Sequence, residues 1–277
     1  MLKTNSARSA LFSYRFLSMV VLATMFAISG CGNKDKYEDD RRTASELYAE
    51  AKQSLDRGNW ASAARGYRLL QTRYPFGRYT QQSMLDLSYA YYKAGITESA
   101  LSTLDRFLRT YPAHPNVDYA FYLKGLVNYD QNLGILEKIM PERVRDRDQT
   151  GLRNAFADFK ELLRRFPNSR YAGDARQRMI FLRNNLAAYE ISVAEFYMRH
   201  KAYVAVTNRA RYVVENYPGT PQNAEALMLL HQSYRELNMP ELADDAWTVL
   251  QLNYPEHYYV LGKKKPRTWK ERLWPFD

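Results

Sequence analysis

Apolar residues recur at helical spacing along most of the chain, and residues 81–112 show the pattern most clearly. Two apolar stripes follow one another there, formed by Met84, Leu87, Tyr91 and Ala94 and then by Ala100, Leu101, Leu104, Phe107 and Leu108. This i, i+3, i+7 spacing predicts two amphipathic helices. Gly95 between them can adopt the left-handed conformation that ends a helix, and Pro112 stops the second helix. Since so short a pair cannot bury its stripes alone, we expect further pairs beside it.

An aromatic residue followed by proline recurs along the helical part of the chain, at Tyr74-Pro75, Tyr111-Pro112, Phe166-Pro167, Tyr217-Pro218 and Tyr254-Pro255. Twelve residues before each proline stands a small or β-branched residue: Ala63, Ala100, Ala155, Val206 and Ala243. Four residues later stand Tyr67, Leu104, Phe159, Ala210 and Trp247, of which only the fourth is small. A helix–turn–helix repeat with a small residue at its centre and a terminal proline is the tetratricopeptide pattern. We therefore predict an all-α tetratricopeptide-repeat solenoid of about five units.

The repeats divide the chain into segments. Residues 44–130 are expected to form N-terminal repeats and 151–255 C-terminal repeats, with one long helix over 171–200. Between them, residues 131–150 read as an insertion loop, which is either functional or disordered. Residues 256–277 are basic and aromatic, and we expect a poorly ordered tail that either touches anionic headgroups or is simply solvated.

The start of the chain resembles a bacterial lipoprotein signal. Basic residues precede an apolar run over residues 16–28, which is too short to span a bilayer. Small residues then lead to Cys31, the only cysteine. We interpret 1–30 as a lipoprotein signal peptide, Cys31 as the acylated N-terminus (palmitate included) and 31–43 as a tether. The alternative is an unpaired or buried thiol. In such lipoproteins, an aspartate directly after the cysteine resembles a signal for retention in the inner membrane. Gly32 stands at that position here, which points to the outer membrane.

Composition excludes several classes of function. The formal net charge is +10, but acidic residues are interleaved with the basic ones, so we expect no nucleic-acid partner. The four histidines are far apart, so we expect no metal and no cofactor. No nucleophile elbow, phosphate loop or paired acid and base is visible, so no catalytic residue is assigned and no enzyme is expected.

Longer strings resemble one family. Three segments resemble the BamD (ComL) family of outer-membrane β-barrel assembly lipoproteins. They are residues 74–95 (YPFGRYTQQSMLDLSYAYYKAG), 111–126 (YPAHPNVDYAFYLKGL) and 166–210 (FPNSRYAGDARQRMIFLRNNLAAYEISVAEFYMRHKAYVAVTNRA). The resemblance implies a non-enzymatic scaffold at the periplasmic face of the outer membrane. It also implies three kinds of partner: BamA, other Bam lipoproteins and unfolded outer-membrane β-barrel proteins. Another tetratricopeptide lipoprotein, such as a pilus-assembly factor, is the alternative, and an accessory of a peptidoglycan enzyme is a third.

We expect the C-terminal half to dock on BamA. Arg209 and Arg211 form an exposed basic pair beside Tyr203, next to an apolar stripe of Val204, Val213 and Val214. The family resemblance implies a partner-facing arginine at the Asn208-Arg209 step. The alternative is that both arginines are simply solvated.

We expect the N-terminal half to receive the client, because the first helix of each unit lines the concave face of such arrays. Repeat phasing turns five side chains toward this groove: Tyr48, Lys52, Leu85, Tyr89 and Tyr92. Aromatic rings and one ammonium suit an extended peptide that ends in an aromatic side chain and a free carboxylate. The alternative is that these tyrosines only pack between repeats.

Overall fold

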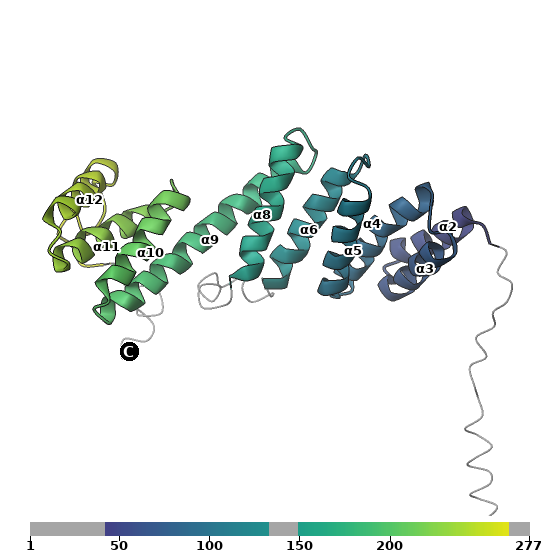
Figure 1. The fold of residues 1–277 in the computed structure, drawn as a ribbon, viewed down its shortest axis with the longest axis horizontal. Coiled ribbons are helices and arrows are strands. Elements are labelled where there is room, and N and C mark those ends of the chain that lie inside the picture. Colours follow the sequence, from purple (N-terminus) through teal and green to yellow (C-terminus); the bar gives the residue numbers. More distant parts are fainter. Residues whose placement is uncertain (1–41, 133–148, 266–277) are drawn as a thin grey trace, which may run out of the picture. The chain divides into compact units, whose positions relative to one another are not determined.

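The computed structural model describes residues 42–132 and 149–265, and these contain ten α-helices and no strand. They form five consecutive pairs: α2 (Ala44–Asp56) with α3 (Trp60–Arg73), α4 (Arg78–Lys93) with α5 (Thr97–Thr110), α6 (Val117–Asn132) with α8 (Thr150–Arg165), α9 (Ala172–Arg199) with α10 (Tyr203–Asn216), and α11 (Asn223–Glu236) with α12 (Pro240–Asn253). Each pair packs on the next, as Figure 1 shows for Thr43 onward. The all-α repeat fold of five units is confirmed.

The aromatic–proline signal marks the end of the second helix in every pair. The residue that caps each of these helices is the predicted aromatic one: Tyr74, Tyr111, Phe166, Tyr217 and Tyr254. The proline that follows each cap cannot continue the helix. Each unit therefore stops where the sequence pattern places its end.

The residues that recur twelve positions before each proline are all buried. Ala63, Ala100, Ala155, Val206 and Ala243 are all at most 1% exposed. The third unit shows how closely its two helices approach. A Cβ atom added to Gly125 on α6 would lie 2.5 Å from the ring of Phe159 on α8, so only glycine fits there. Large side chains one turn later then fill the core, since Tyr67, Leu104 and Phe159 are fully buried.

The predicted boundaries are close to the observed ones. Thr43, assigned to the tether, caps α2 by accepting a hydrogen bond from the Glu46 amide, while the Glu46 carboxylate accepts from the Thr43 amide. Helix α6 runs two residues into the predicted loop 131–150, and α8 begins at its last residue. Residues 133–148 of this loop, the signal peptide with Cys31, and residues 266–277 lie outside the described residues. No described helix is long and apolar enough to cross a membrane.

The expectation of a poorly ordered tail is wrong for residues 256–265. Tyr258, Tyr259 and Val260 pack against the core of the C-terminal units. The Tyr258 hydroxyl donates to the carboxylate of Glu225 on α11, and the Lys265 ammonium lies 2.6 Å from the same carboxylate. The sequence reading missed this segment because its aromatic residues lack helical spacing, although they still bury apolar area.

Candidate functional site

A cavity of about 550 Å³ lies along the first helices of the units. Its lining comes from α2, α4, α6 and the segment before α9, together with Trp60 at the start of α3. The residues are Lys52, Leu55, Asp56, Trp60, Gln82, Asp86, Tyr89, Asn116, Tyr119, Arg170 and Tyr171. Four aromatic rings supply apolar area, and two cations and two carboxylates supply charge. This composition suits an extended peptide better than a small polar metabolite.

Asp86 on α4 fixes one side of this cavity. Its carboxylate accepts hydrogen bonds from the hydroxyl of Tyr48 at 2.7 Å, the hydroxyl of Tyr67 at 3.3 Å and the amide of Gln82 at 3.0 Å. Burial, together with the nearby Asp86 charge, raises the pKa of both phenols, so they stay protonated as donors. The three donors hold the Asp86 carboxylate in place and join α2, α3 and α4.

The other predicted tyrosines lie next along α4. Tyr89 lines the cavity, and its ring meets the ring of Trp60 edge to face at 6.1 Å. Tyr92 donates its hydroxyl to Asp130 on α6, and burial raises the pKa of this phenol. Tyr89 therefore offers a ring surface to the cavity, whereas the Tyr92 hydroxyl ties α4 to α6.

The two cations of the cavity differ in what they contact. The Lys52 ammonium forms an i, i+4 ion pair with Asp56, so its charge already has a partner. The guanidinium of Arg170 lies 4.8 Å from the ring centre of Tyr171 and donates to the hydroxyl of the same residue. Among the described residues, Arg170 contacts no carboxylate. It is the cation of this cavity that can take an anionic ligand without giving up an ion pair.

Leu85 does not belong to this surface, and the expectation for it is wrong. Its side chain is fully buried in a core cluster with Met84, Ala100 and Leu104. Leu85 and Tyr89 are four positions apart on α4 and share a helix face, but the side chain of Leu85 is covered by this core cluster, whereas Tyr89 lines the cavity.

Sequence reasoning missed several residues that line the cavity, among them Trp60, Asp86, Tyr119, Arg170 and Tyr171. Asp86 is one turn before Tyr89 on the same helix, so the phasing that placed Tyr89 could have found it. Trp60 belongs to a second helix, and Arg170 and Tyr171 lie in a connecting segment before α9. Their approach depends on how successive units stack, which repeat phasing alone does not give.

In the C-terminal half, Arg209 has a structural partner. Glu190 on α9 is 1% exposed, and two guanidiniums neutralise it. Arg209 donates to one carboxylate oxygen at 2.8 Å and Arg153 of α8 donates to the other at 3.0 Å. The hydrogen bond to Glu190 raises the pKa of Arg209. The clamp joins α8, α9 and α10, so the expectation that Arg209 is an exposed basic residue is only half right.

The remaining residues of the predicted docking surface are divided between surface and core. Arg211 is exposed, and its guanidinium lies 3.3 Å from the side-chain oxygen of Asn208 and 3.9 Å from Glu215. Tyr203 is partly exposed at the start of α10. Val204 is 61% exposed, but Val213 is fully buried, so the expected apolar stripe does not form one surface.

This chain is similar to known proteins over most of its length. The family model described as YfiO, outer membrane lipoprotein, matches residues 40–250. A protein of Xylella fastidiosa (strain Temecula1) named outer membrane protein assembly factor BamD is 41% identical, over 94% of this chain and 89% of its own length. Proteins of the same name are 39% identical in Neisseria meningitidis serogroup B (87% of this chain, 92% of that protein) and 37% identical in Vibrio cholerae (87% and 98%).

Proposed function

Because the chain belongs to the YfiO family of outer membrane lipoproteins, whose relatives are named BamD assembly factors, we propose that it is a scaffold that binds BamA and unfolded outer-membrane β-barrel proteins. Membership places it among the lipoproteins of the outer-membrane protein assembly machinery. The relatives' names point to a non-enzymatic role. In this proposal, the N-terminal units bind the client, and the C-terminal units dock on BamA at the periplasmic face.

The cavity of the N-terminal units is the observation that carries client binding. Its aromatic side chains can cover the last apolar or aromatic side chain of an extended strand. Its polar groups at Gln82, Asn116 and Asp86 can bond a peptide backbone, because an unfolded strand presents free amides and carbonyls. A β-barrel protein that has not yet folded offers such a strand at its C-terminus.

A free terminal carboxylate needs a cation in the cavity. Lys52 meets the requirement if its ammonium exchanges Asp56 for the ligand, and Arg170 meets it directly. Arginine also binds carboxylates through two parallel hydrogen bonds, which fixes their orientation. We assign the carboxylate to this pair of residues, with Arg170 as the stronger partner.

Site-specific crosslinking tests the assignment. A peptide that carries the last strand of a barrel protein and a photoreactive group near its C-terminus is expected to crosslink within residues 44–130 or at 170–171. Crosslinks confined to residues 203–255 would contradict client binding by the N-terminal units. Tyr89→Ala is expected to weaken crosslinking without a large loss of stability. If Tyr89→Ala and Tyr92→Ala lower only the melting temperature, the tyrosines are core residues and the client binds elsewhere.

Docking on BamA is assigned to the exposed part of α10. Tyr203 and Arg211 lie about two turns apart on this helix, Arg209 points to another of its faces, and Val204 adds exposed apolar surface. Since Arg209 already pairs with Glu190, Arg211 is the residue whose charge is available to a partner. Copurification of BamA with an Arg211→Glu variant tests this role, and unchanged copurification at moderate salt would reject it.

Anchoring is assigned to Cys31. Acyl chains on this residue would hold the chain at the membrane, where more than one chain is needed for stable attachment. Cys31→Ser is expected to release the protein into the periplasm. If the variant stays in the outer membrane at normal yield, partner proteins rather than lipid anchor the chain. Other Bam lipoproteins are proposed as further partners, and no nucleic acid is.

A further inference from the structure

A second cavity, of about 570 Å³, lies between the second helices of the first two units. Helix α3 contributes Arg68, Gln71 and Thr72, helix α5 contributes Ser99, Ser102, Thr103, Arg106 and Arg109, and Leu87 and Tyr91 of α4 complete the lining. We call it the α3–α5 groove. The polar residues of α5 recur every three or four positions, so they form one face of that helix.

The α3–α5 groove carries three positive charges and no negative one. Arg68, Arg106 and Arg109 line it, and none of the lining residues is acidic. Helix α3 contains no aspartate or glutamate at all. On α5, the carboxylate of Asp105 lies 2.9 Å from the ammonium of Lys124 on α6, and Glu98 in the first turn does not line the groove. The charge of the groove is therefore not neutralised from its own walls.

Three hydroxyl groups of the groove already donate to the backbone. Ser102 and Thr103 donate to the carbonyl of Ser99, and Thr72 donates to the carbonyl of Arg68. The charged donors for a ligand are the guanidiniums. Arg106 donates to the amide oxygen of Gln71 at 3.1 Å, a neutral partner that a charged ligand can replace. The guanidiniums of Arg68 and Arg109 have no partner among the described residues.

We propose that the α3–α5 groove binds the phosphate of a phospholipid headgroup. Guanidinium groups match phosphate oxygens in geometry and charge, and several of them around one cavity can share a single phosphate. The proposal adds an interaction with the membrane surface to the anchor and does not depend on client binding.

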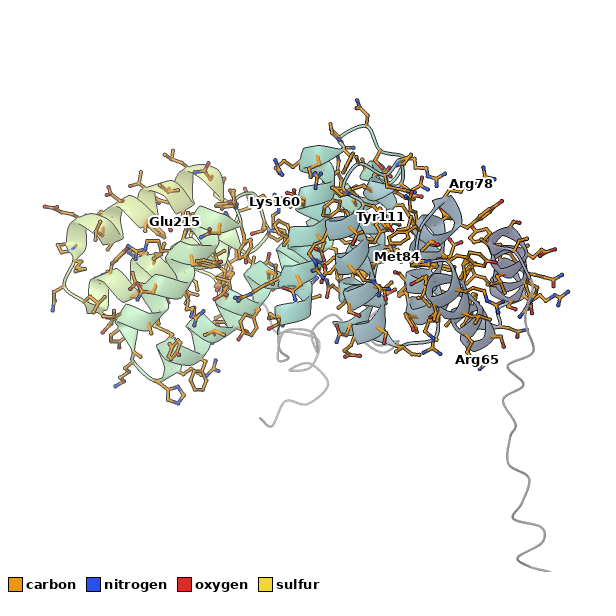
Figure 2. The ribbon with its side chains drawn as sticks, turned by 45° about the vertical axis from the view of Figure 1, so that its right-hand side comes forward. Arg65, Arg78, Met84, Tyr111, Lys160 and Glu215 are labelled. Carbon is orange, nitrogen blue, oxygen red and sulfur yellow. The ribbon has the colours of Figure 1, made fainter. Side chains whose placement is uncertain are left out.

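Two observations favour a lipid over a free anion. The first rests on the anchoring proposed for Cys31: helix α2 packs directly on α3 and begins at Ala44, 13 residues after Cys31, so the groove stays within about 45 Å of chain length from the anchor. Exposed apolar residues also accompany the arginines: Leu69 on α3 is 42% exposed and Phe76, just after α3, is 87% exposed. Such residues enter the interfacial region of a bilayer. Arg65, one turn before Arg68 on α3, is also exposed and adds to the basic surface, whereas Arg78 lies at the opposite edge of the N-terminal units in Figure 2.

Vesicle binding by the full chain tests the proposal. The Cys31→Ser variant serves as parent, so that acyl chains do not dominate attachment. Its binding is measured with phosphatidylethanolamine vesicles that contain about one quarter phosphatidylglycerol, and with inorganic phosphate as a soluble competitor at matched ionic strength. We expect vesicle binding that inorganic phosphate at millimolar concentration barely reduces. Displacement by phosphate at that level, or binding of phosphate without vesicles, would overturn the lipid assignment in favour of a free anion.

Charge variants separate the groove from general surface charge. Replacing Arg68, Arg106 and Arg109 by glutamine is expected to weaken vesicle binding on the order of 100-fold, at roughly fivefold for each arginine near an anionic surface. The control carries the same change of charge at exposed positions outside the groove, with glutamine at Arg57, Lys160 and Arg235. An equal loss in both variants, or no loss in the groove variant, would overturn the proposal.

A single substitution guards against misfolding of the triple variant. Arg109→Gln removes a guanidinium that makes no hydrogen bond among the described residues, so the fold should be unaffected, and we expect about a fivefold loss of vesicle binding. An unchanged affinity would contradict the proposal. Crosslinking of the client peptide should be normal in this variant, so failure of lipid binding and failure of client binding are told apart.

Discussion

The N-terminal and C-terminal units stabilise carboxylates within the repeat array by different hydrogen-bond donors. Around the first cavity, neutral phenols donate to carboxylates, as Tyr48 does to Asp86 and Tyr92 to Asp130. In the C-terminal units, a buried carboxylate is neutralised by two arginines, Arg153 and Arg209 on Glu190. The first arrangement surrounds an open cavity, whereas the second closes the junction of α8, α9 and α10.

The difference indicates which polar residues are available to partners. Phenol–carboxylate bonds keep the Asp86 side chain in place and leave the rings of Tyr89 and Tyr119 facing the cavity. The arginines around Glu190 are committed to the fold, because a buried charge without a partner is costly. An arginine in the C-terminal units is therefore a candidate for recognition only if no buried carboxylate holds it, as at Arg211, whose neighbour Glu215 is exposed.

The largest loss of stability is expected from Arg209→Glu, which removes one of the two arginines that neutralise Glu190. The substitution places a second carboxylate against buried Glu190 and leaves Arg153 to neutralise both. Loss of one partner of a buried pair costs about 3–5 kcal/mol. Urea denaturation should show this loss, whereas Arg211→Glu, one of its exposed neighbours, should change the free energy of unfolding by less than about 0.5 kcal/mol. Equal stability of the two variants would mean that Glu190 is not clamped as described.

A smaller loss of stability is expected from Asp86→Ala, which removes a carboxylate that neutral phenols bind in the N-terminal units. The substitution leaves the hydroxyls of Tyr48 and Tyr67 and the amide of Gln82 without their acceptor. Unpaired buried donors cost about 1–3 kcal/mol, and water can enter from the open cavity and reduce the loss. Denaturation measures the stability, and peptide crosslinking should fall as well because Asp86 positions the wall. A loss as large as that of Arg209→Glu would contradict the distinction between the two halves.

Alkaline pH is expected to lower the stability that the Tyr48–Asp86 hydrogen bond provides in the N-terminal units. The pKa of Tyr48 is raised in the fold by burial and by Asp86, so the unfolded chain loses this proton first. The stabilisation is present below the unfolded value of about 10 and is lost as the pH rises above it. One proton contributes at most about 1.4 kcal/mol per pH unit, and partial exposure of the ring reduces this. The Tyr48→Phe variant should therefore lose less stability above pH 10 than the parent. Identical pH profiles would show that this phenol is not perturbed.

The smallest effect on the fold, and a modest one on binding, is expected for Arg211→Glu. The exposed guanidinium lies 3.9 Å from Glu215, so stability should barely change. An exposed charge pair with BamA contributes about 0.2–1 kcal/mol, which is up to about fivefold in affinity. Copurification at rising salt measures the change. A Lys160→Glu variant of the same charge provides the control, and an equal loss there would reject a specific contact.

Local pattern predicted the repeats, their ends and their core because each depends on a single helix or a single pair. The caps at Tyr74 and Tyr111 and buried Ala63 follow directly from spacing. Interactions between units were not predictable in this way. The two phenols that donate to Asp86 and the two arginines that donate to Glu190 lie 19 to 38 positions away in the sequence. Leu85 shares a helix face with Tyr89, and it is buried only because other helices of the array cover it. The packing of Tyr258 on α11 was missed for the same reason.

The most direct test of client recognition by the N-terminal units compares one peptide in two forms. A barrel protein's last strand is prepared with a free C-terminal carboxylate and with a C-terminal amide, and binding of both is measured by fluorescence anisotropy. The full chain is expected to prefer the acid by about tenfold, because a charge-assisted hydrogen bond contributes about 1.5–3 kcal/mol. Arg170→Met should abolish most of this preference, Lys52→Met a smaller part, and Lys160→Met none. Equal affinity for the acid and the amide, or an undiminished preference in both the Arg170 and the Lys52 variants, would contradict the account.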